Sequence, residues 1–359
     1  MGTERQSNIE LARILASIGV IILHYNNPNI GGGFKYAEGT NNLYILYFLE
    51  SVFICAVNLF VLISGYFLCK SNRRNLWKPI ELIAQVIVFS FGIYIFKITV
   101  FGEEFSIKTV IARLIPANYF AVLYSVLYIM SPFINIVFTN LTKEKSKLLM
   151  MFSVALFAVY PTLVDVLCEI TGRQWIGLST IGAYGAQWGY TIVNFMLMYM
   201  IGAYLRLKGS FILKISWKVN LFILLVCEFI LVIWARINDT VGFYTERSAW
   251  EYCNPIVILS AVLIFCLFAK MNFGVNKFIN RLANSTFTVY LLHGVFLPYI
   301  GIEKAVTGNV MIMLLHICLS VIAIYICCLC VHFIYSWIIK HILGKLRGWI
   351  RLPELNLDK

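Results

Sequence analysis

Four polar residues share one face of the first apolar stretch of the chain, residues 5–25. They are Glu10, Arg13, Ser17 and His24. Because an α-helix turns about 100° per residue, Glu10 and His24 fall about 60° and 20° from Arg13 around the helix axis. An ionisable group in hydrocarbon costs roughly 2.5–3.5 kcal/mol, so a face that carries three such groups indicates a functional site. Histidine titrates near neutral pH, and His24 is therefore the member suited to proton transfer.

A purely structural explanation of this face is also open. Glu10 and Arg13 are three residues apart, which is the spacing of an ion pair within one helix. Such a pair could neutralise itself and hold neighbouring helices together. The third ionisable residue in line, His24, favours function over this alternative.

The composition places the polar face in a membrane. Of the 359 residues, 60% are hydrophobic and only 13% are charged, which is typical of proteins with many membrane-spanning helices. The first apolar run has the length of a full span and lacks a small-residue cleavage site, so we expect a first span and not a cleaved signal. We predict an all-α polytopic membrane protein with about ten transmembrane helices. The predicted spans lie near residues 8–26, 43–69, 79–101, 117–139, 148–168, 189–205, 219–235, 253–269, 282–300 and 309–339.

The net charge of +12 indicates membrane topology and not nucleic-acid binding. Most lysines and arginines fall in alternate loops, which the positive-inside rule assigns to the cytoplasm. We therefore expect both termini to be cytoplasmic, with some attraction to anionic lipid. Residues 341–359 have the pattern of a basic amphipathic tail on the inner membrane surface.

Other polar residues recur inside later spans. Asn58 and Ser64 lie in the second predicted span, and Tyr290 and His293 lie in the ninth. Together with Ser17 they are candidates to line a cavity inside the helix bundle. The alternatives are a bridge between helices for Asn58, close packing for Ser64 and a satisfied core histidine for His293.

A basic cluster precedes the third predicted span. Arg73, Arg74 and Lys78 gather just before Pro79, and arginine forks suit the binding of phosphates. The cluster could equally be a positive-inside anchor. The ten cysteines show no paired spacing in the outer loops, so we expect neither a disulfide framework nor a metal site.

Several segments resemble the acyltransferase-3 family of bacterial integral-membrane acyltransferases. Arg13, ten intervening residues and His24 are similar to the R-x10-H signature of that family. The segment NLFVLISGYFL, which contains Asn58 and Ser64, resembles its second-span motif. LYSVLYIMSPFIN, FMLMYMIGAYLR and STFTVYLLHG resemble its later helices. One departure is that the family often has R-x-x-R before the third span, whereas Arg73 and Arg74 are adjacent here.

The resemblance implies transfer of an acyl group, usually acetyl, from cytoplasmic acyl-CoA (the donor) to a hydroxyl of an envelope polysaccharide or lipid-linked sugar. It implies no bound cofactor and a location in the bacterial inner membrane. The hypothesis is that His24 deprotonates the acceptor hydroxyl or briefly carries the acyl group. Arg13 would stabilise the thioester oxyanion or hold the donor, and Glu10 would orient Arg13. The residues expected to hold the phosphates of acyl-CoA are Arg5, Arg73, Arg74 and Lys78. Residues 1–340 would form the transmembrane acyltransferase domain.

Two other classes of function fit the same pattern. A transporter or flippase for a glycan intermediate would also have about ten spans and buried charges. A non-catalytic partner of a polysaccharide synthase is the third interpretation. For the enzyme, Arg5 and His24 lie roughly 28 Å apart along the first helix, so an acyl group must cross most of the bilayer to reach His24.

Overall fold

The fold is a bundle of apolar helices. The computed structural model describes residues 6–209, 211–241, 248–350 and 352–357. Within these residues, eight helical segments are long and apolar enough to cross a membrane. They consist of α1 (Ser7–Asn26), α3 (Asn42–Phe53) with α4 (Ala56–Leu68), α5 (Trp77–Phe101), α6 (Ile107–Leu114) with α7 (Tyr119–Asn140), α8 (Lys143–Val154) with the π-helix η1 (Ala155–Val159) and α9 (Tyr160–Thr171), α11 (Trp217–Val241), η4 (Ser248–Trp250) with α12 (Pro255–Ala269), and α16 (Val310–Trp349).

The other two predicted spans are also helical but shorter. They are α10 (Ile192–Leu207) and α14 (Thr286–Phe296), the latter continued by η5 (Leu297–Tyr299). The prediction of an all-α polytopic membrane protein is therefore confirmed. The remaining elements are α2 (Gly33–Ala37), η2 (Gln187–Gly189), η3 (Phe211–Lys214), α13 (Lys277–Ala283), α15 (Ile302–Val306), β1 (Arg73–Asn75) and β2 (Glu354–Asn356).

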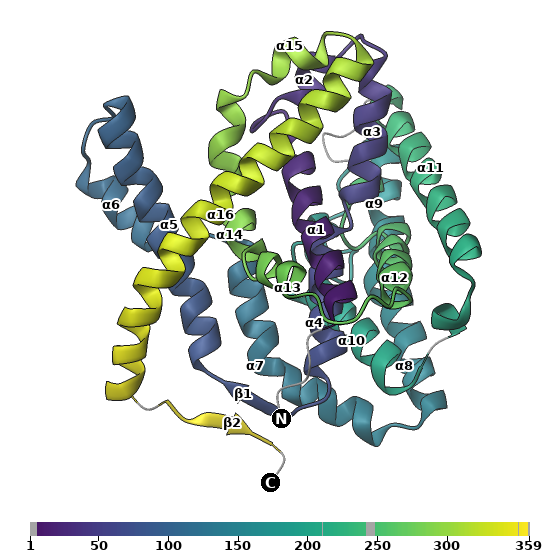
Figure 1. The fold of residues 1–359 in the computed structure, drawn as a ribbon. Helices are drawn as coiled ribbons and strands as arrows, with labels where there is room; N and C mark the ends of the chain where they lie inside the picture. Colours follow the sequence, from purple (N-terminus) through teal and green to yellow (C-terminus); the bar gives the residue numbers. More distant parts are fainter. Residues whose placement is uncertain (1–5, 210, 242–247, 351, 358–359) are drawn as a thin grey trace.

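Helix α1 lies at the centre of the bundle. It packs against α3, α4, α12, α13, α14 and α16, and Figure 1 shows it enclosed by these neighbours. Its first turn is attached to α13, because the Ser7 hydroxyl donates to Asn280 at 2.9 Å and accepts from the Asn276 backbone N–H at 2.7 Å. The polar face of α1 is consequently turned toward protein and not toward lipid.

Glycines bring α4 and α10 into close contact. Gly65 faces the backbone of Tyr199, and Gly202 faces the carbonyl of Leu62. A Cβ atom at either glycine would overlap a backbone atom of the opposite helix. Small residues permit this approach in a membrane, where helices associate by packing and not by exclusion of water. The α4–α10 pair thus forms a rigid support beside α1.

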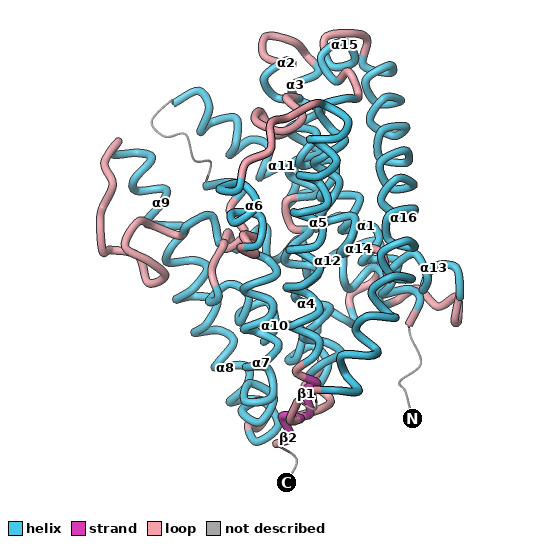
Figure 2. Tube along the Cα trace, turned by 90° about the vertical axis from the view of Figure 1, so that its left-hand side faces the viewer, coloured by secondary structure: helices cyan, strands magenta, loops and turns pink. Residues whose placement is uncertain are grey.

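The two strands mark one end of the molecule. β1 and β2 pair antiparallel, with Arg73 opposite Asn356, and lie at the opposite end from α2 and α15 (Figures 1 and 2). We call these the strand end and the α2 end. His24 belongs to the α2 end, since its carbonyl accepts the Gly31 N–H at 3.0 Å. The first part of the predicted tail continues α16 to Trp349, and the rest includes β2. The cytoplasmic position of the strand end stays a prediction.

Candidate active site

Two histidines from distant parts of the chain meet at the α2 end of the bundle. His24 of α1 and His293 of α14 are 269 residues apart, and Nδ1 of His24 is hydrogen-bonded to Nε2 of His293. Their rings stack with centroids 4.5 Å apart and an interplanar angle of 18°. His293 is buried, whereas His24 keeps part of its surface exposed. The histidine pair therefore connects α1 to α14, the helices of the first and ninth predicted spans.

The partners of His293 assign the protons of both rings. Nδ1 of His293 lies 2.8 Å from the carbonyl oxygen of Val289, and a carbonyl can only accept, so this nitrogen carries a hydrogen. In a neutral ring Nε2 of His293 is then an acceptor, and Nδ1 of His24 must be its donor. This assignment leaves a lone pair on Nε2 of His24, the form that a general base requires.

Glu10 and Arg13 form the ion pair that their spacing predicts. The Arg13 guanidinium lies 3.3 Å from Glu10, whose side chain is 6% exposed, while that of Arg13 is 28% exposed. Arg13 also lies over the ring of Phe67, at 5.9 Å from its centroid. Glu10 thereby holds Arg13 at the edge of a cavity while part of its charge remains accessible.

Two cavities lie near the beginning of α5. The first, cavity I, has a volume of about 290 Å³, and Arg13, Ser64 and Tyr124 line it. The second, cavity II, has a volume of about 560 Å³ and lies between α5, α14 and α16. Lys78 borders both cavities. Arg347 lines cavity II, where it forms an ion pair with Glu81. Arg13, Lys78 and Arg347 therefore line two cavities that share Lys78, and we call the two cavities together the cation-lined path.

Arg74 has a different position from its neighbours in the basic cluster. It is 2% exposed, and its five N–H donors are all directed at protein acceptors. These acceptors are the Ser131 hydroxyl at 2.7 Å, the carbonyls of Ser71, Arg73 and Leu68 at 2.7, 2.8 and 3.0 Å, and the Tyr199 hydroxyl at 3.5 Å. No donor of Arg74 remains for a phosphate in this arrangement. Arg73 and Lys78 are exposed, and Arg5 lies outside the described residues.

The local reason for this burial is a proline in α7. Pro132 lacks an N–H, so the carbonyl of Tyr128, one turn earlier, loses its helical donor. The Ser131 hydroxyl donates to that carbonyl at 2.7 Å and accepts from Nε of Arg74. Arg74 therefore connects the loop after α4 to the proline kink of α7, which favours a structural role.

The other predicted cavity residues have separate surroundings. Ser17 donates to the Ile14 carbonyl at 2.8 Å and approaches Tyr325 of α16 at 3.4 Å. Ser64 accepts from the Tyr124 hydroxyl at 3.0 Å in cavity I. Among the residues predicted to line a cavity, Ser64 therefore lines cavity I, whereas Ser17 lies at the interface between α1 and α16.

Asn58 and Tyr290 complete this set. The Asn58 amide donates to the Tyr252 carbonyl at 2.7 Å and accepts from Asn194 at 3.0 Å, which bridges α4 to α10 and to the turn before α12. The ring of Tyr290 packs at a tilted angle against that of Phe120, with centroids 5.1 Å apart, and its centroid lies 6.5 Å from that of His293. Tyr290 therefore flanks the histidine pair, whereas Asn58 fastens helices.

Sequence reasoning missed Glu81, Arg347 and Tyr124. Glu81 and Arg347 lie 266 positions apart, and only their charges in otherwise amphipathic segments could have drawn attention to them. Tyr124 is one of many aromatic residues in an apolar span, and no local signal distinguishes it.

The fold and the site together define a class, which is a multi-pass membrane protein with an oriented histidine and with cations on the walls of cavities between its helices. Residues 6–339 match the family model described as an acyltransferase domain, and the chain belongs to the acyltransferase-3 family. It is therefore a membrane acyltransferase. No curated protein and no solved structure gives a match.

Proposed function

We propose that this protein transfers an acetyl group from cytoplasmic acyl-CoA to a hydroxyl of a cell-envelope polysaccharide or its lipid-linked precursor. It would act in the inner membrane of a bacterium. The observation that carries this proposal is the histidine pair, whose hydrogen bonds leave a lone pair on Nε2 of His24. Such a nitrogen is the group that acyl transfer to a hydroxyl requires.

The reaction then proceeds in one displacement. Nε2 of His24 accepts the proton of the acceptor hydroxyl while the hydroxyl oxygen attacks the thioester carbonyl. The tetrahedral oxyanion collapses, the C–S bond breaks, and the thiolate of CoA leaves. Imidazolium returns the proton to that sulfur, so the products are an ester and CoA thiol. The Val289 carbonyl and His293 keep neutral His24 in the required tautomer, with a hydrogen on Nδ1 and a lone pair on Nε2, until it accepts the proton.

The donor fits the cation-lined path at the strand end. Phosphates of acyl-CoA would contact Arg73, Lys78 and Arg347, with the remainder of the molecule in cavities I and II. Arg13 and His24 are eleven residues apart in one helix, or about 16 Å along its axis. Both side chains cannot contact one carbonyl over that length. Of the two roles expected of Arg13, holding the donor is the one that this geometry supports.

The thioester end of acyl-CoA must therefore extend past Arg13 to His24 along α1, so that the attack and the C–S cleavage both take place at His24. The small exposed part of His24 and the partial exposure of Arg13 support a passage along this face. A polar passage within the hydrocarbon layer of a membrane is possible only where protein surrounds it. Helix α1 meets this condition, because its neighbouring helices enclose it.

Sealed membrane vesicles test the proposal. With acetyl-CoA on the strand side and a lipid-linked glycan in the membrane, we expect stoichiometric CoA thiol release and an acetyl ester on the glycan by mass spectrometry. Movement of the glycan without consumption of acetyl-CoA would support the flippase alternative instead. No feature of the described residues favours that alternative over transfer.

A further inference from the structure

A second pair of cavities is separate from cavities I and II and lies on the side of α5 that faces α6 and α14. Their volumes are about 460 and 320 Å³, and both are lined by Ile93 and Arg113. We call the two together the α5–α14 groove. Phe101 and Tyr299, whose rings stack with centroids 5.3 Å apart, line the smaller of the two cavities.

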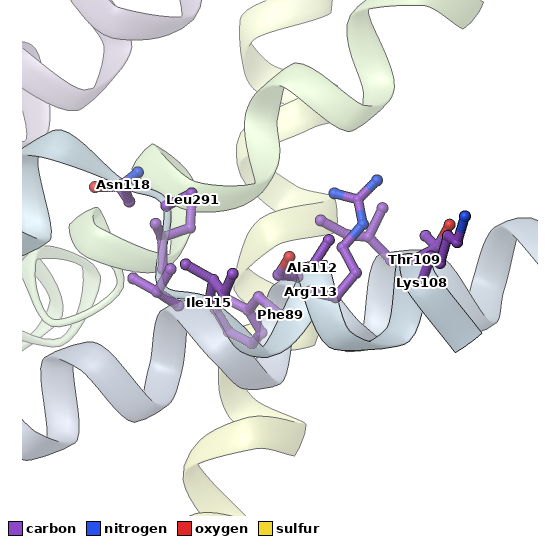
Figure 3. Close-up of a pocket in the computed structure, with 12 residues that line it drawn as sticks. Phe89, Lys108, Thr109, Ala112, Arg113, Ile115, Asn118 and Leu291 are labelled. Carbon is purple, nitrogen blue, oxygen red and sulfur yellow. The ribbon is translucent and has the colours of Figure 1, made fainter. Parts of the chain in front are cut away.

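The groove combines an apolar lining with three cations, Lys97, Lys108 and Arg113. Figure 3 shows Phe89, Ile115 and Leu291 gathered together, and the polar ends of Arg113 and Lys108 on the other side. Volumes of this size are in the range of small-molecule sites. The lining is thus suited to an amphiphile with an apolar chain and an anionic head.

Two of these three cations have no protein partner in the part of the chain that the structure describes. Arg113 and Lys108 make no side-chain hydrogen bond or ion pair there, whereas Lys97, which lines the smaller cavity, is paired with Glu103 at 3.2 Å. A cation that merely reaches the membrane surface would point away from the bundle. Arg113 instead lines both cavities, and its planar fork matches the oxygens of a phosphate.

The position of the groove relates it to the histidine pair. Leu291 and Gly294 line it, and these residues flank His293 in α14. The cavity that contains Arg113 and Gly294 also includes Pro298. A phosphate at Arg113 therefore lies at the level of the first helical turn after His293, one helix away from His24.

We propose that the α5–α14 groove binds the phosphate and the first part of the chain of an anionic, phosphate-bearing lipid that presents the acceptor hydroxyl to His24. This inference rests on the proposed function and specifies how the acceptor arrives: laterally, from the bilayer. Arg113 and Lys108 hold the phosphate, and the apolar lining holds the lipid chain.

Photolabelling of the full chain in nanodiscs, without acyl-CoA, tests the binding. The probe is a phosphatidic acid with a photoreactive group on its acyl chain, in excess phosphatidylcholine. Wild-type protein should give adducts on residues 86–93 and 291–295. Arg113→Ala with Lys108→Ala should bind at least about tenfold more weakly, because charge-assisted hydrogen bonds are lost. Lys304→Ala, which removes an exposed cation of α15 outside the groove, is the matched control and should label as the wild type does.

Further arms keep the test decisive. Ala112→Trp fills the groove without a change of charge and should also abolish these adducts, whereas Arg113→Lys should retain most of them. Equal labelling of the double variant and the control would overturn the proposal. So would equal labelling by a photoreactive phosphatidylcholine, or competition by inorganic phosphate that removes the adducts.

Transfer assays separate this inference from the proposed function. Arg113→Ala should raise the KM for a lipid-linked acceptor by about tenfold and leave the KM for acetyl-CoA unchanged. If the lipid binds but the KM for the acceptor does not change, the acceptor role of the groove is wrong while acyl transfer by His24 stands.

Discussion

Substitution of His293 tests the orientation of the proposed base. His293→Ala removes the only ring acceptor to which Nδ1 of His24 donates within the described residues, and also the link to the Val289 carbonyl. An unsatisfied buried donor costs about 1–3 kcal/mol, which corresponds to roughly 5- to 150-fold. Because His24 can then rotate or change tautomer, we expect kcat to fall by that factor. The fall should be smaller than the loss on removal of His24 itself.

The assay is release of CoA thiol coupled to ester formation in vesicles, over a range of pH. A lost orientation lowers kcat and leaves the KM for acetyl-CoA unchanged, whereas a general packing defect would lower the amount of folded protein. His293→Gln, whose amide oxygen can still accept from His24, should recover part of the rate. A His293→Ala protein with wild-type kcat would refute the argument about the tautomer.

The remaining predictions concern the basic cluster before α5 and the contact between α4 and α10. Arg74→Ala should reduce thermal stability and folded yield strongly, by about 3 kcal/mol or more, since it leaves several acceptors without donors; Arg73→Ala, on the exposed neighbour, should leave both within error, and equal effects would contradict the structural role of Arg74. Lys78→Ala should raise the KM for acetyl-CoA by about three- to tenfold with little change in kcat, and an unchanged KM would assign Lys78 to topology alone. Gly202→Leu should separate α4 from α10 and lower the melting temperature, because its side chain meets backbone atoms of α4; a melting temperature equal to that of the wild type would mean that the contact is loose.

The helical class was predictable because apolar length is a local property. Each of the ten predicted spans contains a helix, although α10 and α14 are too short to meet a length criterion for crossing a membrane by themselves. The mean hydropathy of a sequence window cannot distinguish these shorter helices from helices that span the whole bilayer. Their identity depends on neighbours, since α10 is buried against α4 and α14 against α16.

The site was predictable only as one face of one helix. Helical periodicity correctly aligned Glu10, Arg13, Ser17 and His24, but it cannot say what lies opposite each residue. In the structure Arg13 opens to cavity I, Ser17 contacts α16 and His24 contacts α14. The pairing of His24 with His293 spans 269 residues, and no local pattern contains it.

Arg74 shows the converse limit. Arg73 and Arg74 are adjacent before a span and look equivalent in sequence, so the sequence predicts that both bind phosphates. Burial separates them, because the proline kink of α7 supplies acceptors that surround Arg74 and leave Arg73 at the surface. The whole set of roles for site residues stays a prediction until transfer is measured.

The most direct test of the central claim is the rate of acetyl transfer by His24→Gln in sealed vesicles. Glutamine retains a hydrogen-bonding side chain but has no basic nitrogen, and His341→Gln on the exposed part of α16 serves as the matched control. With folded protein at equal amounts, kcat should fall by about 10²- to 10⁴-fold for His24→Gln and stay unchanged for the control. A His24→Gln protein that transfers acetyl at a rate within about twofold of the wild type would contradict a role for His24 as the base.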